Sequence, residues 1–337
     1  MKETATSSLD ARLEFLHDLK PPGVLRAQPR ESIHALLAGK ESWLEHALTR
    51  NGAILFRGFG LSAKEFRDLS AQLFGDSFRP YLGGTSPRVQ INEGVYESTR
   101  FPRSLSLPLH NEMSYLPEPP RRIAFFCDVP AASGGETPLA DSREIYQRIP
   151  PAVRAVFETS GIRYHRYFYG PGWNAVSSAI HRLAPLHRSW MAAFQTTDRA
   201  EVEKICARQG VSVEWDNEDG VLLTNTLPAA RQHPVTGETI WFNQATAFLL
   251  TPRSAGTLRW LLYQLAWPNA RRRPFYASFA SGEAITLRQL NDVNEAIGGA
   301  ATRFAWHRGD LLLLDNYLVA HGRMPFRGQR RILVAMS

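Results

Sequence analysis

The sequence has little cysteine and no long apolar run. Only two cysteines, Cys127 and Cys206, occur in 337 residues, too few for a disulfide framework or a zinc knuckle. Both suit buried thiols in a reducing compartment. No run of roughly 18 apolar residues is present, so we expect no transmembrane helix. The N-terminal residues lack the apolar core of a secretory signal. We therefore expect a cytoplasmic protein without membrane association.

Signatures of nucleic-acid binding are also missing, although the chain is basic. The net charge is +7 and the pI about 9.6, with short arginine clusters such as Arg271-Arg272-Arg273. No helix-turn-helix, zinc-finger or RNA-binding pattern accompanies this charge, so nucleic acid is not the expected partner. A basic surface suits an anionic small substrate or an acidic protein partner equally well.

Apolar residues, by contrast, are plentiful: they make up 44% of the sequence, which is enough for a sizeable core. We expect residues 1–30 to form an N-terminal arm and residues 31–337 a single domain. Irregularly spaced strands with helices mostly at the flanks favour one large sandwich-like domain. The segments near 80–105 and 161–196 are long and irregular. Such segments serve as active-site lids, or pack as loops on the core.

Local patterns predict the main elements. Helices are expected near 31–50, 63–74, 143–149, 151–159, 198–210, 254–266 and 286–298. Strands are expected near 52–58, 122–127, 238–244, 309–316 and 329–335, with a hairpin over 211–225.

His110 and Glu112 form the first candidate site. On an extended segment, residues two apart point to the same side, so an imidazole and a carboxylate can reach one cation. Alone, the pair equally describes a polar surface loop. His321 supplies a third ligand, because it follows a buried apolar strand and precedes a glycine turn. Taken alone it also fits a core histidine. Together, two histidines and a carboxylate match the facial triad of non-haem Fe(II) oxygenases.

Two arginines follow on the last expected strand. A 2-oxo dicarboxylic acid that chelates Fe(II) has a far carboxylate, and a buried carboxylate calls for a bidentate arginine. Strand alternation sends Arg330 and Arg331 to opposite faces, so only one of them lies inside. Thr137, beside the tight Gly134-Gly135 turn, is a candidate hydroxyl for the same carboxylate. Alternatively, Arg331 is a surface charge on an edge strand, and Thr137 is only a turn hydroxyl.

In this order, these motifs resemble the taurine dioxygenase-like Fe(II)/2-oxoglutarate oxygenases. The resemblance runs from about residue 50 to the C-terminus, and His-x-Glu with Gly-Gly-Glu-Thr-Pro-Leu-Ala-Asp is most similar to the branch of syringomycin-biosynthesis hydroxylases and clavaminate synthase. It implies a double-stranded β-helix, a jelly-roll variant. It also implies Fe(II), 2-oxoglutarate and O2 as cofactor and co-substrates. Its motifs are His110-Asn111-Glu112, Gly134-Gly135-Glu136-Thr137, His321-Gly322-Arg323 and Gln329-Arg330-Arg331-Ile332.

By position, the resemblance implies His110, Glu112 and His321 as metal ligands. It implies Arg331 with Thr137 as the carboxylate site, since Arg331 is the second arginine of Gln-Arg-Arg-Ile. Ala335 stands where the taurine enzymes have a further arginine. Related halogenases replace the carboxylate by a small residue to admit chloride. Glu112 therefore favours hydroxylation, or desaturation or cyclisation by the same oxidant.

The implied substrate is a small amino acid or derivative, free or tethered to an acyl or peptidyl carrier protein, in specialised metabolism such as antibiotic biosynthesis. The alternatives are a non-catalytic metal- and 2-oxoglutarate-binding protein on the same scaffold, and a nucleic-acid demethylase of similar chemistry. Away from the site we expect a local ion pair between Asp141 and Arg143 and a core position for 241–243. No ligand role is expected for the remaining candidate histidines, His165, His181 and His307.

Overall fold

The computed structural model describes residues 8–18, 20–74, 83–84, 90–92, 94–98, 101–171 and 187–337. Its largest sheet, the main sheet, has eight strands in the order β1-β2-β3-β17-β7-β20-β5-β4. All its neighbouring strands are antiparallel except β2 and β3. The strands are β1 (Glu14–His17), β2 (Lys20–Arg26), β3 (Ala53–Arg57), β4 (Gln90–Asn92), β5 (Val95–Glu97), β7 (Arg122–Val129), β17 (Leu311–Asp315) and β20 (Arg331–Met336).

The prediction of an N-terminal arm over residues 1–30 is wrong for residues 14–26. These residues form β1 and β2, and β2 pairs along β3. Val24 and Leu25 in β2 are fully buried. The apolar Val-Leu pair supplies the burial that holds this segment in the sheet, although the neighbouring prolines suggest a loop.

A second sheet of four strands, the minor sheet, has the order β16-β9-β18-β6. One apolar cluster contains side chains from both sheets, including Leu312 and Ile332 of the main sheet and Leu139 and Val319 of the minor sheet. The two sheets therefore face each other, as in a jelly roll. The strands are β6 (Leu107–His110), β9 (Thr137–Asp141), β16 (Ala301–Phe304) and β18 (Val319–Arg323).

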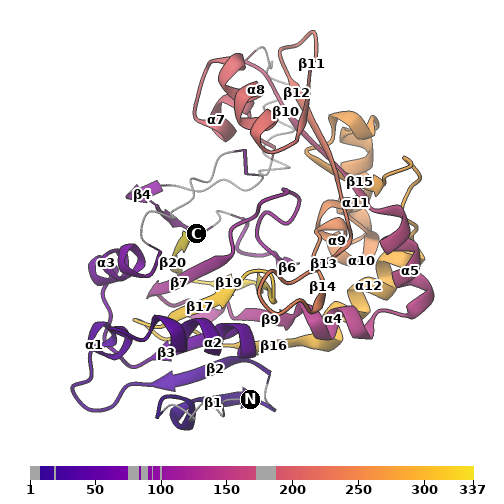
Figure 1. Cartoon of the computed structure of the whole chain (residues 1–337). Coiled ribbons are helices and arrows are strands. Elements are labelled where there is room, and N and C mark those ends of the chain that lie inside the picture. The colour runs from indigo at the N-terminus through magenta and orange to yellow at the C-terminus, as the bar shows by residue number, and fades with distance from the viewer. Residues whose placement is uncertain are drawn as a thin grey trace.

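A third sheet, at the top of Figure 1, has the order β11-β12-β10-β15. Its strand β10 (Ile162–Phe168) lies where we expected an irregular segment, so that prediction is wrong. Ile162, Tyr164 and Phe168 are buried, and β10 pairs with strands on both sides. The hairpin of β11 (Ser212–Trp215) and β12 (Val221–Leu227) is confirmed. The remaining strands are β8 (Ser133–Gly134), β13 (Ala230–Gln232), β14 (Thr239–Trp241), β15 (Phe275–Phe279) and β19 (Phe326–Arg327).

The helices lie around the sheets, as expected (Figure 1). Instead of one helix over 31–50 there are two, because Gly39 has φ of +66° and interrupts the run. The expected capping box at Thr286 and Gln289 is present. The helices are η1 (Asp10–Arg12), α1 (Ile33–Leu37), α2 (Glu41–Asn51), α3 (Ala63–Phe74), α4 (Ser142–Arg148), α5 (Pro151–Ser160), α7 (Trp190–Phe194), α8 (Arg199–Arg208), α9 (Ala245–Phe248), α10 (Pro252–Ala255), α11 (Thr257–Ala266), η3 (Ala270–Arg272) and α12 (Leu287–Ala300).

The main sheet separates two apolar clusters. Along β17, Leu311 and Leu313 pack with α2 and α3 in one cluster, whereas Leu312 and Leu314 pack in the other. This alternation is the period of two that a strand imposes. The cluster that contains Leu312 and Leu314 fills the space between the two sheets, and the candidate metal ligands lie there. Among the described residues, no helix has both the length and the apolar character to span a bilayer.

Candidate metal centre

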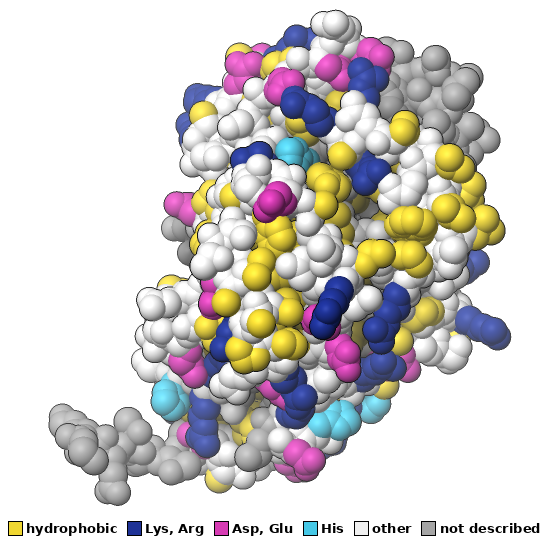
Figure 2. Space-filling view, turned by 90° about the vertical axis from the view of Figure 1, so that its right-hand side faces the viewer, with side chains coloured by type: hydrophobic (Ala, Val, Ile, Leu, Met, Phe, Trp, Pro, Cys, Tyr) yellow, Lys and Arg dark blue, Asp and Glu magenta, His cyan; other side chains and the backbone are white. Residues whose placement is uncertain are grey.

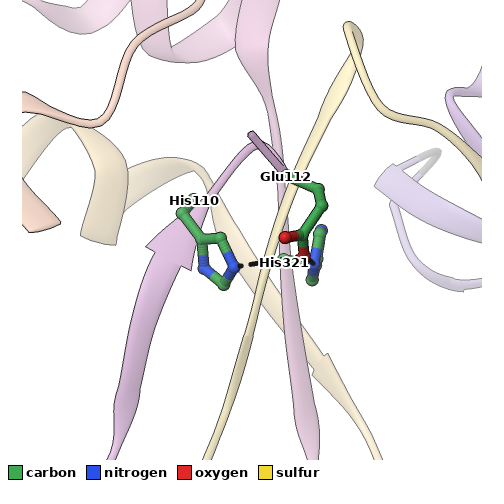
Figure 3. A group of neighbouring side chains, drawn as sticks. All are labelled: His110, Glu112 and His321. Carbon is green, nitrogen blue, oxygen red and sulfur yellow. Dashed lines mark ion pairs between the residues drawn. The ribbon is translucent and has the colours of Figure 1, made fainter. Parts of the chain in front are cut away.

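Strand pairing brings the two candidate histidines together. β6 and β18 are antiparallel neighbours, and His110 lies directly opposite His321, with ring centroids 4.7 Å apart. The Nε2 atom of each ring is 3.8 Å from Oε2 of Glu112. The three side chains point toward one another (Figure 3), and one ligand atom from each lies within 4.8 Å of the others.

Gly322 permits this close pairing. A Cβ atom at this position would lie 2.6 Å from the carbonyl oxygen of Leu107, on the neighbouring strand. Any side chain would therefore push β18 away from β6 at the residue next to His321. The glycine predicted as a turn instead lies within β18 and lets two backbones approach.

Asn316 fixes the backbone of Glu112. Its Oδ1 accepts a hydrogen bond from the Glu112 N–H at 2.7 Å. Its Nδ2 donates to the carbonyl oxygens of Glu112 at 2.9 Å and Pro120 at 2.8 Å. Asn316 is fully buried, so these bonds are shielded from water. The carboxylate of Glu112 is thus presented by a backbone held at both its N–H and its C=O.

The chain turns sharply after Glu112. Met113 has φ of +52°, in the left-handed region that non-glycine residues rarely adopt. Such a conformation costs about 1–3 kcal/mol and persists only where the surroundings enforce it. Hydrogen bonds from Ser114 N–H to the Asn111 carbonyl (3.2 Å) and from Leu116 N–H to the Met113 carbonyl (2.8 Å) close the turn. Backbone strain is therefore concentrated next to the carboxylate.

Hydrogen bonding sets the tautomer of His110. Its Nδ1 lies 2.8 Å from the carbonyl oxygen of Pro108. A carbonyl only accepts, so Nδ1 carries the proton and Nε2 keeps its lone pair for a cation. The ring of Phe125 lies against His321, with centroids 5.1 Å apart. Two imidazoles and a carboxylate in an apolar setting are a donor set that fits Fe(II).

The three side chains line a cavity between the two sheets. Thr137 and Trp306 line it as well, together with the guanidinium-bearing residues Arg323 and Arg330. Thr137 Oγ1 accepts a hydrogen bond from Trp306 Nε1 at 2.9 Å, which leaves the hydroxyl proton available for a ligand. Trp306 was not among the residues picked from the sequence. It lies far from Thr137 in the chain, and no spacing links the two.

The choice of Arg331 as the inward arginine is wrong. Arg330 and Ile332 line the cavity, whereas Arg331 points outward and pairs with Asp128 at 2.9 Å. Within β20, Ile332 and Val334 belong to the cluster between the sheets and Leu333 to the outer cluster. Arg331 therefore lies on the outer side. Arg330 donates from Nε to the Gly135 carbonyl at 3.3 Å.

Two arginines, Arg323 and Arg330, line the cavity without a carboxylate paired to them in the described part of the chain. Among the described residues, neither Arg323 nor Arg330 forms an ion pair. Burial lowers the pKa of Arg330 to about 10, and the positive charge of Arg323 adds to this effect. Burial likewise lowers the pKa of Arg323 to about 10. A buried positive charge of this kind is stabilised by an anionic ligand.

Arg323 also anchors a neighbouring segment. Its guanidinium donates to the carbonyl oxygens of Phe101 at 2.9 Å and of Pro102 and Leu105 at 2.7 Å. The end of the segment near 80–105 is thereby tied to the strand that carries His321. In the sequence, Arg323 is recognisable only as part of the His-Gly-Arg motif, and its anchoring contacts were not predicted.

The remaining expectations concern residues outside the cavity. Asp141 and Arg143 form the expected ion pair at 2.6 Å, and the core position of 241–243 is confirmed. His307 is exposed and His165 lies on β10; neither lines the cavity. His181 lies outside the described residues.

Two facing sheets with a His-x-Glu and a distal histidine between them define the class of jelly-roll non-haem Fe(II) oxygenases. The model of the taurine catabolism dioxygenase TauD, TfdA family matches residues 18–336, and the chain belongs to this family. It is an Fe(II)/2-oxoglutarate-dependent dioxygenase with the double-stranded β-helix fold, as the sequence resemblance implied.

Individual relatives agree with this assignment. The chain is 31% identical to the dapdiamide synthesis protein DdaC of Enterobacter agglomerans, over 87% of this chain and 84% of the relative. It is 28% identical to a clavaminate synthase-like protein of Arabidopsis thaliana, over 88% and 84%. The fold is similar to that of PvcB from Pseudomonas aeruginosa, with a TM-score of 0.52 and 15% identity over 93% and 84% of the two chains.

Proposed function

We propose that His110, Glu112 and His321 hold Fe(II), and that Arg330 and Thr137 bind the far carboxylate of 2-oxoglutarate. The enzyme then hydroxylates an unactivated C–H bond of a small amino-acid-like substrate. The observation that carries the proposal is that the three clustered ligands line the same cavity as Arg330.

The chemistry divides between cofactor and protein. When bound, Fe(II) with 2-oxoglutarate and O2 supplies the oxidising power: 2-oxoglutarate loses CO2 and becomes succinate, one oxygen atom enters succinate, and the other enters the product. Arg330 and the Thr137 hydroxyl orient the co-substrate, and Trp306 holds that hydroxyl through its N–H. The apolar walls formed by Phe125 and Ile332 exclude water from the reacting centre.

Glu112 supports oxygenation rather than halogenation. Its carboxylate takes the position that a halide would need, and Asn316 holds its backbone in place. Hydroxylation, desaturation and cyclisation all begin with removal of hydrogen from the substrate. Product mass separates them, because only hydroxylation adds an oxygen atom.

The substrate class we propose is an amino acid or derivative, free or tethered to a carrier protein. The name of the relative DdaC, a dapdiamide synthesis protein, supports a biosynthetic role, and the net charge of +7 suits an acidic carrier. The segments near 80–105 and 161–196 are proposed to set specificity. Of these, residues 80–82, 85–89, 93, 99–100 and 172–186 lie outside the described residues. A cytoplasmic location is proposed because both cysteines are buried free thiols.

The test begins with anaerobic protein. Adding Fe(II) and then 2-oxoglutarate should produce the visible charge-transfer band of a chelated 2-oxo acid, and His110→Ala should abolish it. Succinate release is then screened against free amino acids and carrier-bound aminoacyl groups, and product mass is measured. A band that survives in His110→Ala would refute the ligand assignment. A band without any substrate-dependent succinate would favour the non-catalytic alternative.

A further inference from the structure

Helix α11 presents its apolar face to the outside. Of the ten residues from Thr257 to Ala266, none is buried. Leu258 and Leu265 are 70% and 77% exposed, and Leu261 and Leu262 are 46% and 47% exposed. Their spacing of three, four and seven residues places all four on one stripe of the helix. We call these four residues the leucine stripe.

The opposite face of α11 attaches the helix to the protein. The Tyr263 hydroxyl donates to the Phe275 carbonyl at 3.2 Å. Tyr263 also packs against Trp267 in a tilted arrangement, with ring centroids 5.1 Å apart, and Trp267 is buried. Tyr263 and Trp267 thus face inward and the leucines outward. Since the inward face fixes the orientation of the helix, the exposure of the leucine stripe is built into the fold.

Basic residues are frequent in the sequence around the leucine stripe, and two of them, Arg271 and Arg272, pair with Glu214 and Glu218. Residues 239–282 include five arginines and no aspartate or glutamate. Arg253 and Arg259, in α10 and α11, are exposed, and among the described residues neither forms an ion pair. Figure 2 looks onto the side of the molecule where α11 lies in Figure 1, and there hydrophobic side chains and basic side chains lie close together.

We propose that the leucine stripe is a docking surface for an acidic protein whose contact element is an amphipathic helix. The stripe is about as wide as one helix face, which suits helix-on-helix packing. Arg253 and Arg259 pair with carboxylates at the rim of the contact. The proposal goes beyond the oxygenase reaction and does not depend on it.

The charge and the aromatic residues exclude the other occupants. A second copy of this chain would bring its own arginines against Arg253 and Arg259, and residues 239–282 contain no aspartate or glutamate to neutralise them. A membrane-surface helix places tryptophan and tyrosine at the headgroups, whereas Tyr263 and Trp267 are turned into the protein and Trp260 is half-buried.

Contacts connect α11 to the metal centre. The backbone carbonyl of Phe275 accepts the hydrogen bond of Tyr263. The ring of Phe275 packs on Phe248, with centroids 5.4 Å apart. Phe248 in turn packs on Tyr115 at 5.4 Å, and Tyr115 follows Glu112 by three residues. A protein bound at the leucine stripe therefore lies over elements that lead directly to the turn carrying Glu112.

The test uses a synthetic helical peptide of about three heptads, with leucine at the core positions and glutamate elsewhere, and its counterpart with lysine in place of glutamate. Binding to the full chain is measured by fluorescence anisotropy. We expect the glutamate peptide to bind and the lysine peptide to bind at least roughly tenfold more weakly. Leu261→Glu with Leu265→Glu should weaken binding of the glutamate peptide by roughly tenfold or more. Arg253→Glu with Arg259→Glu should weaken it and strengthen binding of the lysine peptide.

Leu287→Glu is the matched control, because Leu287 is an exposed leucine at the start of α12; it should leave binding unchanged. Circular dichroism and thermal unfolding establish that each variant is folded. Equal binding of both peptides, or equal loss in Leu287→Glu, overturns the proposal. So does a dimer of the free chain, or co-sedimentation with phosphatidylglycerol vesicles, that the α11 leucine variant abolishes.

Discussion

At the scale of single residues, the carboxamide of Asn316 makes a testable contribution. Asn316→Asp keeps the acceptor for Glu112 N–H but loses both donated hydrogen bonds and places a carboxylate near two carbonyl oxygens. We expect a loss of about 2–4 kcal/mol of stability and an Fe(II) affinity lowered by roughly tenfold, the scale seen for residues that orient ligands. Thermal unfolding and anaerobic metal titration measure the two effects.

Asn243→Asp provides the control for Asn316. Asn243 is also buried, donates to the Ala229 carbonyl at 2.8 Å and accepts from Ala245 N–H at 3.1 Å. It should lose stability while its folded form keeps the wild-type metal affinity. Equal losses of metal affinity in both variants would mean that Asn316 has no particular effect on Glu112.

The two neighbouring arginines give a second prediction. Arg330→Ala should raise the KM for 2-oxoglutarate by about 100-fold, because a buried carboxylate then loses its charged partner. Arg331→Ala should leave this KM within about twofold, since it removes only a half-exposed pair with Asp128. Succinate formation at varied 2-oxoglutarate concentration measures both. The reverse ranking would restore Arg331 as the co-substrate ligand.

The error over Arg331 shows what the residues alone determine. The sequence predicts that Arg330 and Arg331 point to opposite faces, but not which face is inside. That phase depends on how β20 pairs with β7 and β5, a contact between distant parts of the chain. The hydrogen bond from Trp306 to Thr137 likewise joins distant parts of the chain, so the sequence does not predict it. By contrast, His110 and Glu112 were recognisable because their spacing is local.

At the scale of elements, the contact of β6 with β18 depends on Gly322. Gly322→Ala would place a Cβ atom 2.6 Å from the Leu107 carbonyl oxygen, so the strands must separate at the pair His110 and His321. We expect Fe(II) affinity to fall by roughly tenfold or more and the melting temperature to fall, because positioned ligands tolerate little displacement. Anaerobic titration and calorimetry measure these changes.

Gly298→Ala is the control for Gly322. No atom lies within 4 Å of a Cβ at this position in α12. An alanine within a helix is favoured over glycine by about 0.5–1 kcal/mol, so this variant should be slightly more stable and bind metal normally. A Gly322→Ala protein with normal metal affinity would show that the two strands accommodate the methyl group.

Several elements were predictable because their signals are local. The helix expected over 63–74 matches α3, and the capping box at Thr286 opens α12 as expected. The strand β10 was missed because its aromatic and polar residues resemble a loop until two neighbours pair with them. The leucines of α11 look like core residues in the sequence. Only the orientation of Tyr263 reveals that they face outward.

At the scale of the whole molecule, ligand binding should stabilise the fold. In the proposed site, Fe(II) and 2-oxoglutarate would bind residues of both sheets and offset the charge of Arg330, all of which line the cavity. With each free ligand at about 100 times its Kd, linkage gives about 2.7 kcal/mol for each ligand and about 5.5 kcal/mol for the two together, equivalent to a rise of roughly 8 °C in Tm. Anaerobic thermal unfolding measures this rise, and chelation of the metal should reverse it. An equal rise with 2-oxoglutarate alone would place the anion at a site independent of the metal.

The strand order of the main sheet also has a consequence for synthesis on the ribosome. β17 lies between β3 and β7, and β20 lies between β7 and β5. Both strands follow β7 in the chain only after β15 and α12, so a nascent chain that ends before Leu311 leaves β7 without either of its neighbours. Exposed strand edges of this kind invite aggregation. Commitment to the native sheet is therefore delayed until β17 and β20 have left the ribosome.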